Sequence, residues 1–347
     1  MDTDSAEQPP NHPVATLHPR RSVARVLGFT ALALVALVLL VPLIWPVPPI
    51  PDAVEPSALA DPDSRFVELD GISFHYVTEG DTECAVILLH GFGASTVSWE
   101  TVLPDLSARC TAIAFDRPAF GLTQRLLPGQ WEGDNPYTLS AAADQTVALM
   151  DALGIEKAVL VGHSAGGAVA VVTAAEYPER VRGLVLEAPA IYADGGPHAW
   201  LRPVLTTPQA RRIGPLFLRR ALAGDAGIEF VRGAWADPDA ITDEAIEAYR
   251  RPLQIRDWDR ALWEYTIAPQ TADPVRALAD VRAPVLVIAG KQDTYVPFEQ
   301  SVRVADELGA RLVTFEDAAH IPHEEFPERF VNEIYRFLDD LAGSGEP

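Results

Sequence analysis

The chain has 347 residues, 48% of them hydrophobic, and a formal net charge of −22 at pH 7. This length accommodates one large domain with an insertion, and the apolar content is that of a folded protein. The strong negative charge argues against nucleic acid as a partner. The sequence has no zinc-type Cys/His cluster and no dinucleotide-binding glycine pattern, so it predicts neither a metal site nor a cofactor.

The N-terminal part of the chain predicts a membrane segment. Residues 1–25 are expected to form a cytoplasmic tail, which contains the arginines Arg20, Arg21 and Arg25. Residues 26–45 form an uncharged apolar run that matches the thickness of a bilayer, and arginines before such a run place the N-terminus in the cytoplasm. We therefore expect a single-pass signal anchor in the cell membrane, with an extracytoplasmic domain. Secretion after cleavage of a signal peptide is the alternative, and a buried globular helix is a third interpretation.

After the apolar run, the pattern becomes that of a folded domain. Residues 46–64 are proline-rich and polar, which predicts a stiff linker. From there on, apolar β-branched runs alternate with helical patterns, which predicts an α/β fold with a mostly parallel central sheet and helices on both faces. The core is expected at residues 65–190 and 280–342, with an inserted helical cap at 191–279. The last residues, 343–347, are expected to form a disordered tail.

The expected core elements follow one another in a regular order. A hairpin of Arg65–Leu69 and Ile72–Thr78 turns at Asp70-Gly71. Further strands are expected at Cys84–Leu89, Thr111–Phe115, Ala158–Val161, Val181–Leu186, Pro284–Ala289 and Arg311–Phe315. Helices are expected at Trp99–Ala108, Thr138–Leu153, Ala165–Ala175 and, in the cap, Ile241–Tyr249. Catalytic groups of such folds gather at the carboxyl ends of the parallel strands.

The strongest motif is a G-x-S-x-G pentapeptide between a strand and a helix. Gly162-His163-Ser164-Ala165-Gly166 follows the apolar strand and opens the alanine-rich helix. A serine on such a sharp turn adopts a strained backbone that lifts its hydroxyl out of the sheet, and the flanking glycines avoid collisions with neighbouring elements. The helix N-terminus behind the serine favours a developing anion.

In this context the chain resembles the α/β-hydrolase family. Three further motifs carry the resemblance: the turn Asp116–Gly121, the loop Gly290-Lys291-Gln292-Asp293, and the PHEEFP run at Pro322–Pro327. The turn has Ala119 where the family usually has glycine, and we interpret it as structural. The resemblance covers about residues 66–341. The chain resembles capped bacterial esterases and lipases, and this resemblance implies their fold.

The resemblance also implies the site residues. Family order places a nucleophile, an acid and a base along the chain, which are Ser164, Asp293 and His320. Glu187, at the end of the preceding strand, is an alternative acid. The backbone N–H groups of Phe92 and Ala165 would form the oxyanion hole. Supporting roles fall to His90, Gly91, Gly162, His163, Gly166 and His323.

A serine nucleophile predicts transfer of an acyl group to water. Relatives that cleave carbon–halogen bonds or epoxides carry aspartate at the position of Ser164. The expected enzyme is therefore a carboxylesterase or lipase-like hydrolase acting by an acyl-enzyme. The many aromatic residues of the cap indicate a small-molecule ester or lipid with an apolar acyl or aryl group. The alternatives are a carbon–carbon bond hydrolase or perhydrolase with the same triad, and a non-catalytic ligand-binding protein.

Cys84 and Cys110 are the only cysteines, and each stands six residues before the end of an expected strand, at His90 and Asp116. These two strands are expected to be neighbours. An oxidising compartment would permit a disulfide between them. Because cross-linking directly paired strands strains the bond, two free buried thiols are the expected state.

Overall fold

The computed structural model describes residues 19–192, 196–197 and 199–343. The chain divides into two compact units, residues 1–46 and residues 47–347. The expected N-terminal tail up to residue 18 and the expected C-terminal tail from residue 344 lie outside the described residues. Gly343, which was also expected in that tail, is instead the last residue of a helix.

The first unit contains helix α1 (Pro19–Ile44). It begins before the expected start of the apolar run, because the arginine-containing stretch continues the helix. Within it, Val23–Ile44 spans 22 residues with a mean hydropathy of 2.7, which is long and apolar enough to cross a membrane. By length and composition it suits a membrane anchor or a signal peptide.

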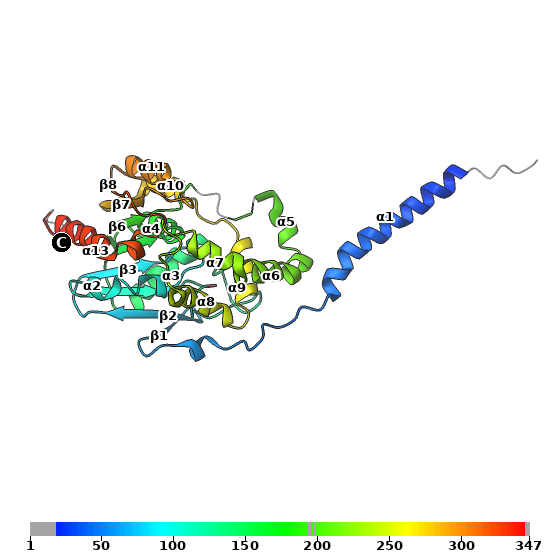
Figure 1. The fold of residues 1–347 in the computed structure, drawn as a ribbon, viewed down its shortest axis with the longest axis horizontal. Helices are drawn as coiled ribbons and strands as arrows, with labels where there is room; N and C mark the ends of the chain where they lie inside the picture. Colours follow the sequence, from blue (N-terminus) through cyan, green and yellow to red (C-terminus); the bar gives the residue numbers. More distant parts are fainter. Residues whose placement is uncertain (1–18, 193–195, 198, 344–347) are drawn as a thin grey trace, which may run out of the picture. The chain divides into compact units, whose positions relative to one another are not determined.

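The second unit is built on an eight-stranded sheet with the strand order β1-β2-β4-β3-β5-β6-β7-β8 (Figure 1). β2 pairs antiparallel with β1 and β4, and every later pair is parallel. The strands are β1 (Arg65–Leu69), β2 (Ile72–Glu79), β3 (Ala85–Leu89), β4 (Thr111–Phe115), β5 (Ala158–His163), β6 (Val181–Glu187), β7 (Val285–Gly290) and β8 (Arg311–Phe315). The predicted mostly parallel sheet is confirmed.

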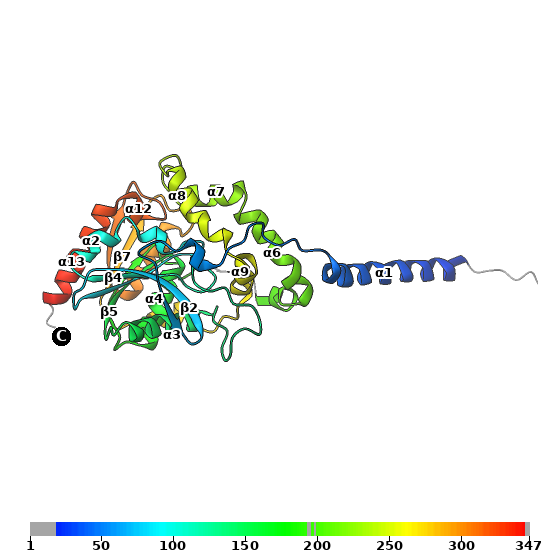
Figure 2. The same ribbon diagram turned by 90° about the horizontal axis from the view of Figure 1, so that it is seen from below.

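Helices cover both faces of this sheet. Alternate strand residues point to opposite sides, so the apolar strands place hydrophobic side chains on both faces. Ile87 and Leu89 of β3 belong to one apolar cluster, and Val86 and Leu88 belong to another. The first cluster packs against α3 (Leu139–Ala152), α4 (Ala165–Glu176) and α11 (Phe298–Leu308). The second packs against α2 (Leu103–Ser107) and α13 (Pro327–Gly343). In Figure 2, α3 and α4 lie across the strands from α2 and α13.

Two local elements show how the sequence specifies the chain path. Asp70 and Gly71 join β1 to β2 with φ of 51° and 77°, the left-handed pair that a two-residue hairpin requires. The expected helix Trp99–Ala108 is wrong in its first half. The chain forms a 3₁₀ turn, η2 (Thr96–Trp99), and then the short helix α2. Pro104 lacks an N–H and fits only the first turn, so the helix begins just before it.

The segment between β6 and β7, which the sequence predicts as a cap and which is called the cap below, consists of short helices. They are η3 (Ala199–Leu201), α5 (Arg202–Leu205), α6 (Pro208–Leu222), α7 (Asp225–Arg232), α8 (Asp243–Arg250), η4 (Arg251–Gln254), α9 (Trp258–Ile267), α10 (Pro274–Ala277) and η5 (Leu278–Asp280). After the cap the chain returns to β7. Helix α12 (Pro322–Glu325) follows β8.

The segment expected as a spacer packs against the second unit from Pro48 onward. The Arg219 guanidinium donates to the Pro48 carbonyl oxygen at 2.6 Å, and Val54 forms a parallel bridge with Ile255. The segment also contains a 3₁₀ turn, η1 (Pro56–Leu59). Most of the proline-rich linker is therefore part of the folded surface.

Cys84 and Cys110 form a disulfide, so the expectation of two free thiols is wrong. The register of β3 and β4 pairs Ala85 with Thr111, which places the preceding cysteines directly opposite each other. Their Cα atoms are 4.6 Å apart, a spacing that a disulfide accommodates without backbone movement.

Replacing both cysteines by serine is expected to lower the free energy of unfolding by about 3 kcal/mol, because the bond closes a loop in the unfolded chain. The cysteines are 26 residues apart in sequence. Denaturant unfolding of wild type and variant measures the loss, and reductant should destabilise only the wild type. Alkylation of wild type without reductant would contradict the disulfide.

Candidate active site

Ser164 lies at the sharp turn between β5 and α4. Its backbone has φ of 51° and ψ of −116°, a strained conformation for a residue with a side chain. Two backbone hydrogen bonds hold the turn. The Ser164 N–H donates to the Glu187 carbonyl oxygen at 2.9 Å, and the Ala190 N–H donates to the Ser164 carbonyl oxygen at 3.0 Å. A Cβ added at Gly162 would lie 2.6 Å from the Gly166 carbonyl oxygen, so glycine is required beside the serine.

His320 and Asp293 meet beside this turn. His320 Nδ1 donates to Asp293 Oδ2 at 2.8 Å, and both side chains are buried. The other carboxylate oxygen of Asp293 accepts the backbone N–H groups of Tyr295 and Val296, at 2.8 and 3.0 Å. The acid is thus held in one orientation, and it leaves Nε2 of His320 as the acceptor nitrogen.

His163 links the serine turn to the His320 loop. Its Nε2 donates to the His320 carbonyl oxygen at 3.0 Å, and the two rings lie 4.7 Å apart. Burial, with the charges of His320 and His323, holds the pKa of His163 well below its usual value. In the described structure no hydrogen bond joins the Ser164 hydroxyl to His320. Such bonds in hydrolytic sites are often long until substrate binds.

Two backbone N–H groups are available next to the serine. In the described part of the chain, no protein acceptor takes the N–H of Phe92 or of Ala165, the first residue of α4. Gly91 allows the first of these to approach, because a Cβ there would lie 2.8 Å from His163 Nδ1 and 3.2 Å from the Ser164 Cβ. The arrangement suits an oxyanion developing at Ser164.

His90 braces this loop from behind. Its Nδ1 donates to the Gly91 carbonyl oxygen at 2.7 Å, and its Nε2 accepts the Arg117 N–H at 3.1 Å. Burial and the charge of Arg117 lower the pKa of His90 to about 3. The ring is therefore neutral, in the tautomer that these two bonds require.

Glu187 pairs with His323 rather than with His320. The Glu187 carboxylate lies 2.7 Å from His323 Nδ1 and accepts the His323 backbone N–H at 2.9 Å. Both side chains are fully buried, and the Trp99 ring lies 4.4 Å from the imidazole. The alternative acid Glu187 thus pairs with His323 and not with the candidate base His320.

Two glutamates of the PHEEFP run, which were not among the predicted site residues, connect the cap to the His320 loop. The Glu325 carboxylate accepts the N–H of Ala236, in the cap, at 2.8 Å and that of Ala319, beside His320, at 2.7 Å. Glu324 is hydrogen-bonded to Tyr249 of α8. Two adjacent acids between apolar residues of this run were the available signal.

Raising the pH from about 5 to about 8 is expected to lower the free energy of unfolding by about 2 kcal/mol. Burial raises the pKa of Glu324 from 4.5 to about 7. Between these pH values the unfolded chain has lost the proton that the folded protein keeps, so a rise in pH favours unfolding. Burial opposes charge on His323, but the Glu187 carboxylate outweighs this and raises the pKa of His323. Its stabilising charge is lost as the pH rises.

Denaturant unfolding at several pH values measures this slope. Glu324→Gln keeps a partner for Tyr249 and should flatten the slope. An unchanged slope in that variant would assign the pH dependence to other groups.

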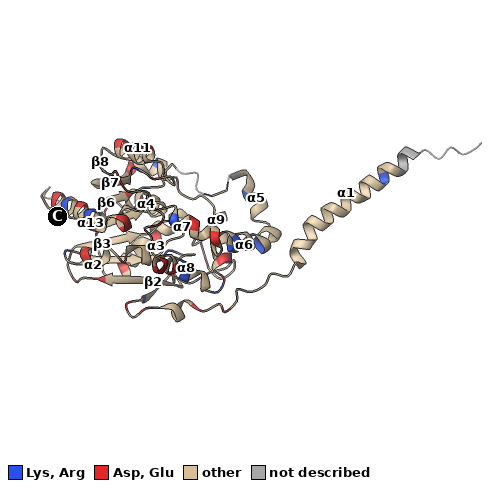
Figure 3. Cartoon of the chain, in the orientation of Figure 1, with Lys and Arg blue, Asp and Glu red and all other residues tan. Residues whose placement is uncertain are grey.

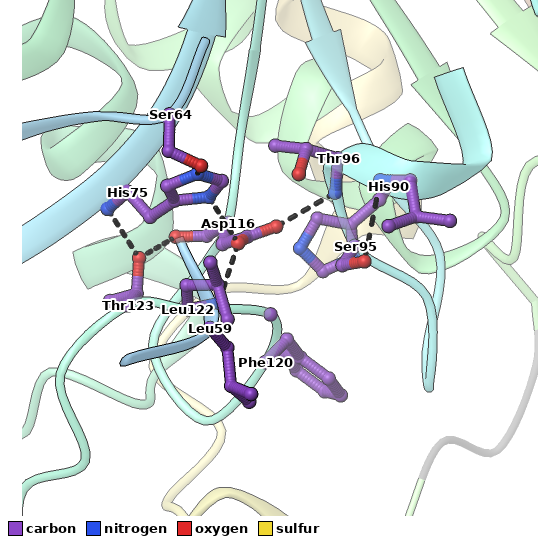
Figure 4. Close-up of polar contacts among 12 residues, drawn as sticks. Leu59, Ser64, His75, His90, Ser95, Thr96, Asp116, Phe120, Leu122 and Thr123 are labelled. Atoms are coloured by element: carbon purple, nitrogen blue, oxygen red, sulfur yellow. Dashed lines mark hydrogen bonds and ion pairs between the residues drawn. The ribbon is translucent and has the colours of Figure 1, made fainter. Parts of the chain in front are cut away.

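The Asp116–Gly121 turn is anchored by a second buried cluster (Figure 4). Asp116 accepts His75 Nδ1–H at 2.7 Å and the N–H groups of Thr96 and Leu122, at 2.7 and 2.6 Å. His75 Nε2 lies 2.9 Å from the Ser64 hydroxyl. Burial raises the pKa of Asp116, but the hydrogen bond and charge of His75 outweigh it, and the pKa is lowered.

Ser64, His75 and Asp116 are hydrogen-bonded in the same order as a catalytic triad, but they share no other feature with one. The neighbouring cavity is lined by four further acids, Asp61, Asp63, Glu79 and Glu100. Negative charge would oppose an oxyanion there. The cluster instead fixes the end of the linker and β2 to the turn.

Ala119→Gly is expected to raise the free energy of unfolding by about 1 kcal/mol, because a left-handed residue with a Cβ is strained. Ala119 has φ of 78°, and it stands where the family usually has glycine. Ala148→Gly, in the middle of α3, is the matched control and should cost about 1 kcal/mol. Thermal and denaturant unfolding measure both changes. Destabilisation by Ala119→Gly would contradict the strain.

Aromatic side chains from core and cap surround the loop His90–Gly93, called the oxyanion loop below after its expected role. The Phe92 ring lies 5.7 Å from Phe120, 6.4 Å from Phe230 of α7 and 6.2 Å from Tyr265 of α9. Phe120 and Phe230 also line an apolar cavity under the cap, together with Leu222, Trp258 and Leu262. Among the described residues, no group of three or more His, Cys, Asp or Glu is placed to hold a metal ion.

Comparison with known proteins gives matches over the same part of the chain. A family model described as alpha/beta hydrolase fold matches residues 85–327. The dihydrolipoyllysine-residue acetyltransferase component of the acetoin cleaving system of Cupriavidus necator is 29% identical to this chain over 279 residues. The match covers 80% of this chain and 69% of that protein. A 2-hydroxy-6-oxo-6-phenylhexa-2,4-dienoate hydrolase of Comamonas testosteroni is 28% identical, covering 78% and 93%. The solved structure of a thermophilic esterase from Thermogutta terrifontis has a TM-score of 0.65 at 25% identity, covering 80% and 99%.

Proposed function

The chain belongs to the alpha/beta hydrolase fold family, and from this premise we propose that it is a serine hydrolase that cleaves an ester through an acyl-enzyme. One observation supports this most directly. The His320–Asp293 pair, bonded at 2.8 Å, lies beside a serine held in a strained turn. This proposal makes Ser164 the nucleophile, His320 the base and Asp293 the orienting acid.

In the proposed reaction, His320 Nε2 removes the proton of Ser164 as its oxygen attacks the ester carbonyl. Asp293 accepts a hydrogen bond from the Nδ1–H group, which keeps the correct tautomer and stabilises the imidazolium. The N–H groups of Phe92 and Ala165 donate to the negative oxygen of the tetrahedral intermediate. His320 then protonates the leaving alcohol, and a water molecule that it deprotonates releases the acid.

The proposed substrate is an ester with an apolar acyl or aryl group. The aromatic rings of Phe92, Phe120, Phe230 and Tyr265 lie against one another around the oxyanion loop. The cavity under the cap is predominantly apolar, and such walls bind apolar ligands with a few polar groups for orientation.

Carbon–carbon bond hydrolysis is the second candidate. It is favoured by the similarity to the Comamonas testosteroni hydrolase, whose name states a 2-hydroxy-6-oxo-dienoate substrate. The same nucleophile and base would serve both reactions, so the pocket decides between them.

The test is a substrate panel for the purified full chain. p-Nitrophenyl esters of increasing acyl length are compared with a 2-hydroxy-6-oxo-dienoate. Ester turnover that exceeds dienoate turnover supports the proposal, and its peak length separates an esterase from a lipase. Dienoate turnover alone would replace the ester proposal. Absence of turnover on both would favour a ligand-binding protein or a perhydrolase, which a peracid assay with hydrogen peroxide distinguishes.

We further propose that α1 is a signal anchor that leaves the second unit outside the cytoplasm. The apolar stretch Val23–Ile44 and the arginines that precede it support this. Full-length protein should remain in membranes after an alkaline wash, and protease added outside the membrane should digest the second unit. A shortened protein in the medium would instead indicate a cleaved signal.

A further inference from the structure

One segment of the cap differs in charge from the rest of the chain. Residues 199–222, called the cap surface below, contain five arginines and no acidic residue, while the whole chain has a net charge of −22. The arginines are Arg202, Arg211, Arg212, Arg219 and Arg220. Figure 3 shows blue segments along α5 and α6. Such a segment attracts an anionic partner that the remaining surface repels.

The same segment exposes large apolar side chains. Trp200 is 73% exposed, Phe217 67% and Val204 60%, whereas no other large hydrophobic side chain described in the second unit exceeds 39%. Phe217 and Arg220 are three residues apart on α6 and therefore share one face. Exposed aromatic residues beside arginines are typical of helices that lie in the interface of a membrane.

The inner side of α6 is fixed to the domain, so this surface is held in place. Arg219 pairs with Asp259 of α9 at 2.6 Å, and Arg211 pairs with Glu264 at 3.3 Å. Leu222, at the end of α6, lines the apolar cavity under the cap. The exposed Phe217 thus belongs to the same helix as a wall of that cavity.

The chain connection limits where this helix lies relative to a membrane. Arg219 also binds the Pro48 carbonyl oxygen at 2.6 Å, so Pro48 is part of the folded cap. Only residues 45–47 separate it from Ile44, the last residue of α1. Whatever the orientation of the two units, these residues span at most about 14 Å, because an extended chain advances about 3.5 Å per residue.

We propose that the cap surface binds an anionic phospholipid bilayer, with Trp200, Val204 and Phe217 inserted among the lipid head groups. Arg220, which shares a face of α6 with Phe217, would contact the lipid phosphates. The inference rests on the proposed membrane insertion of α1, which places its end at the interface. It also refines the substrate class. An enzyme held at the bilayer by this surface would meet esters that are dissolved in the bilayer.

The test places a fluorophore on the cap surface of the full chain. Cys84 and Cys110 are bonded to each other, so an introduced cysteine is the only free thiol. Phe217→Cys carries the label, and Asp306→Cys, on the exposed side of α11, is the matched control. Both proteins are labelled with an environment-sensitive dye and reconstituted in vesicles of phosphatidylcholine and phosphatidylglycerol that contain a spin-labelled quencher lipid.

Quenching at position 217 is expected to exceed that at position 306 by at least about twofold, because a residue in the interface meets the quencher. Equal quenching would overturn the proposal. A blue shift at 217 that grows with protein concentration, without lipid quenching, would also overturn it and indicate contact with a second copy of the chain.

A charge variant tests the electrostatic part. Arg220→Glu in the Phe217→Cys background should reduce the quenching by about half, and pure phosphatidylcholine should do the same. Arg276→Glu, a charge reversal on exposed α10, should leave the quenching unchanged. An effect of both reversals alike would contradict a specific surface.

Two readouts in the same samples keep this test separate from the earlier proposals. Flotation of the protein with the vesicles reports the insertion of α1, and its failure contradicts both the anchor and the cap surface. Hydrolysis of p-nitrophenyl esters tests the proposed esterase activity, and its result does not depend on the quenching.

Discussion

Replacing Ser164 by alanine is expected to lower kcat for the best ester by at least about 10⁴-fold while leaving the fold intact. The side chain is small, and the strain of the turn lies in the backbone, at φ of 51°. Single-turnover kinetics and a fluorophosphonate probe measure the loss, since the probe labels an activated serine. Activity equal to wild type would contradict Ser164 as nucleophile.

The acid partner is tested by a matched pair of variants. Asp293→Asn should cost about 10³- to 10⁴-fold in kcat, because an amide no longer stabilises the charged His320 and disturbs its tautomer. Glu187→Gln is the control: it removes a buried carboxylate of similar depth that faces His323. It should lower stability and reduce kcat by less than about tenfold. The reverse ranking would assign the acid role to Glu187.

Gly166→Ala is expected to prevent accumulation of folded protein, or to lower the free energy of unfolding by more than about 4 kcal/mol. Its Cβ would lie 2.0 Å from the Leu89 carbonyl oxygen and 2.8 Å from that of His90. These are backbone atoms of β3 and its extension, so no side chain can rotate to make room. Helix α4 would have to move away from the sheet, and the serine would move with it.

Soluble yield, circular dichroism and denaturant unfolding measure this effect. Gly343→Ala, at the end of α13 with nothing within 4 Å of its added Cβ, is the control and should be nearly neutral. Ser164→Ala and Gly166→Ala should therefore both lose activity, but only the second should lose the fold. A stable Gly166→Ala protein would show that the turn tolerates a wider separation from β3.

Local sequence determined most of the secondary structure. β-branched runs such as Ala85–Leu89 form buried strands, and Thr138 caps α3 by accepting the Ala141 N–H at 3.2 Å. The glycines around Ser164 are likewise a local requirement of the turn. Patterns of this kind depend on neighbours a few residues away, so they can be predicted without tertiary contacts.

Tertiary structure decided between the pairings of distant groups that the sequence left open. Asp293 and Glu187 both end strands, and only the packing of the loops after β7 and β8 pairs the first with His320 and the second with His323. The register of β3 with β4, not the spacing of the cysteines, determines the disulfide.

The cap contacts follow the same rule. The carboxylate of Glu325 bridges N–H groups that are 83 residues apart in sequence, those of Ala236 and Ala319. The proline-rich segment after α1 was predicted to be a spacer, because its sequence shows no periodic apolar pattern. Arg219 nevertheless binds this segment through the carbonyl oxygen of Pro48, a backbone group that every residue carries. Backbone acceptors and strand register leave no mark on composition or periodicity, which is why the sequence by itself located the catalytic candidates but not the contacts that hold them.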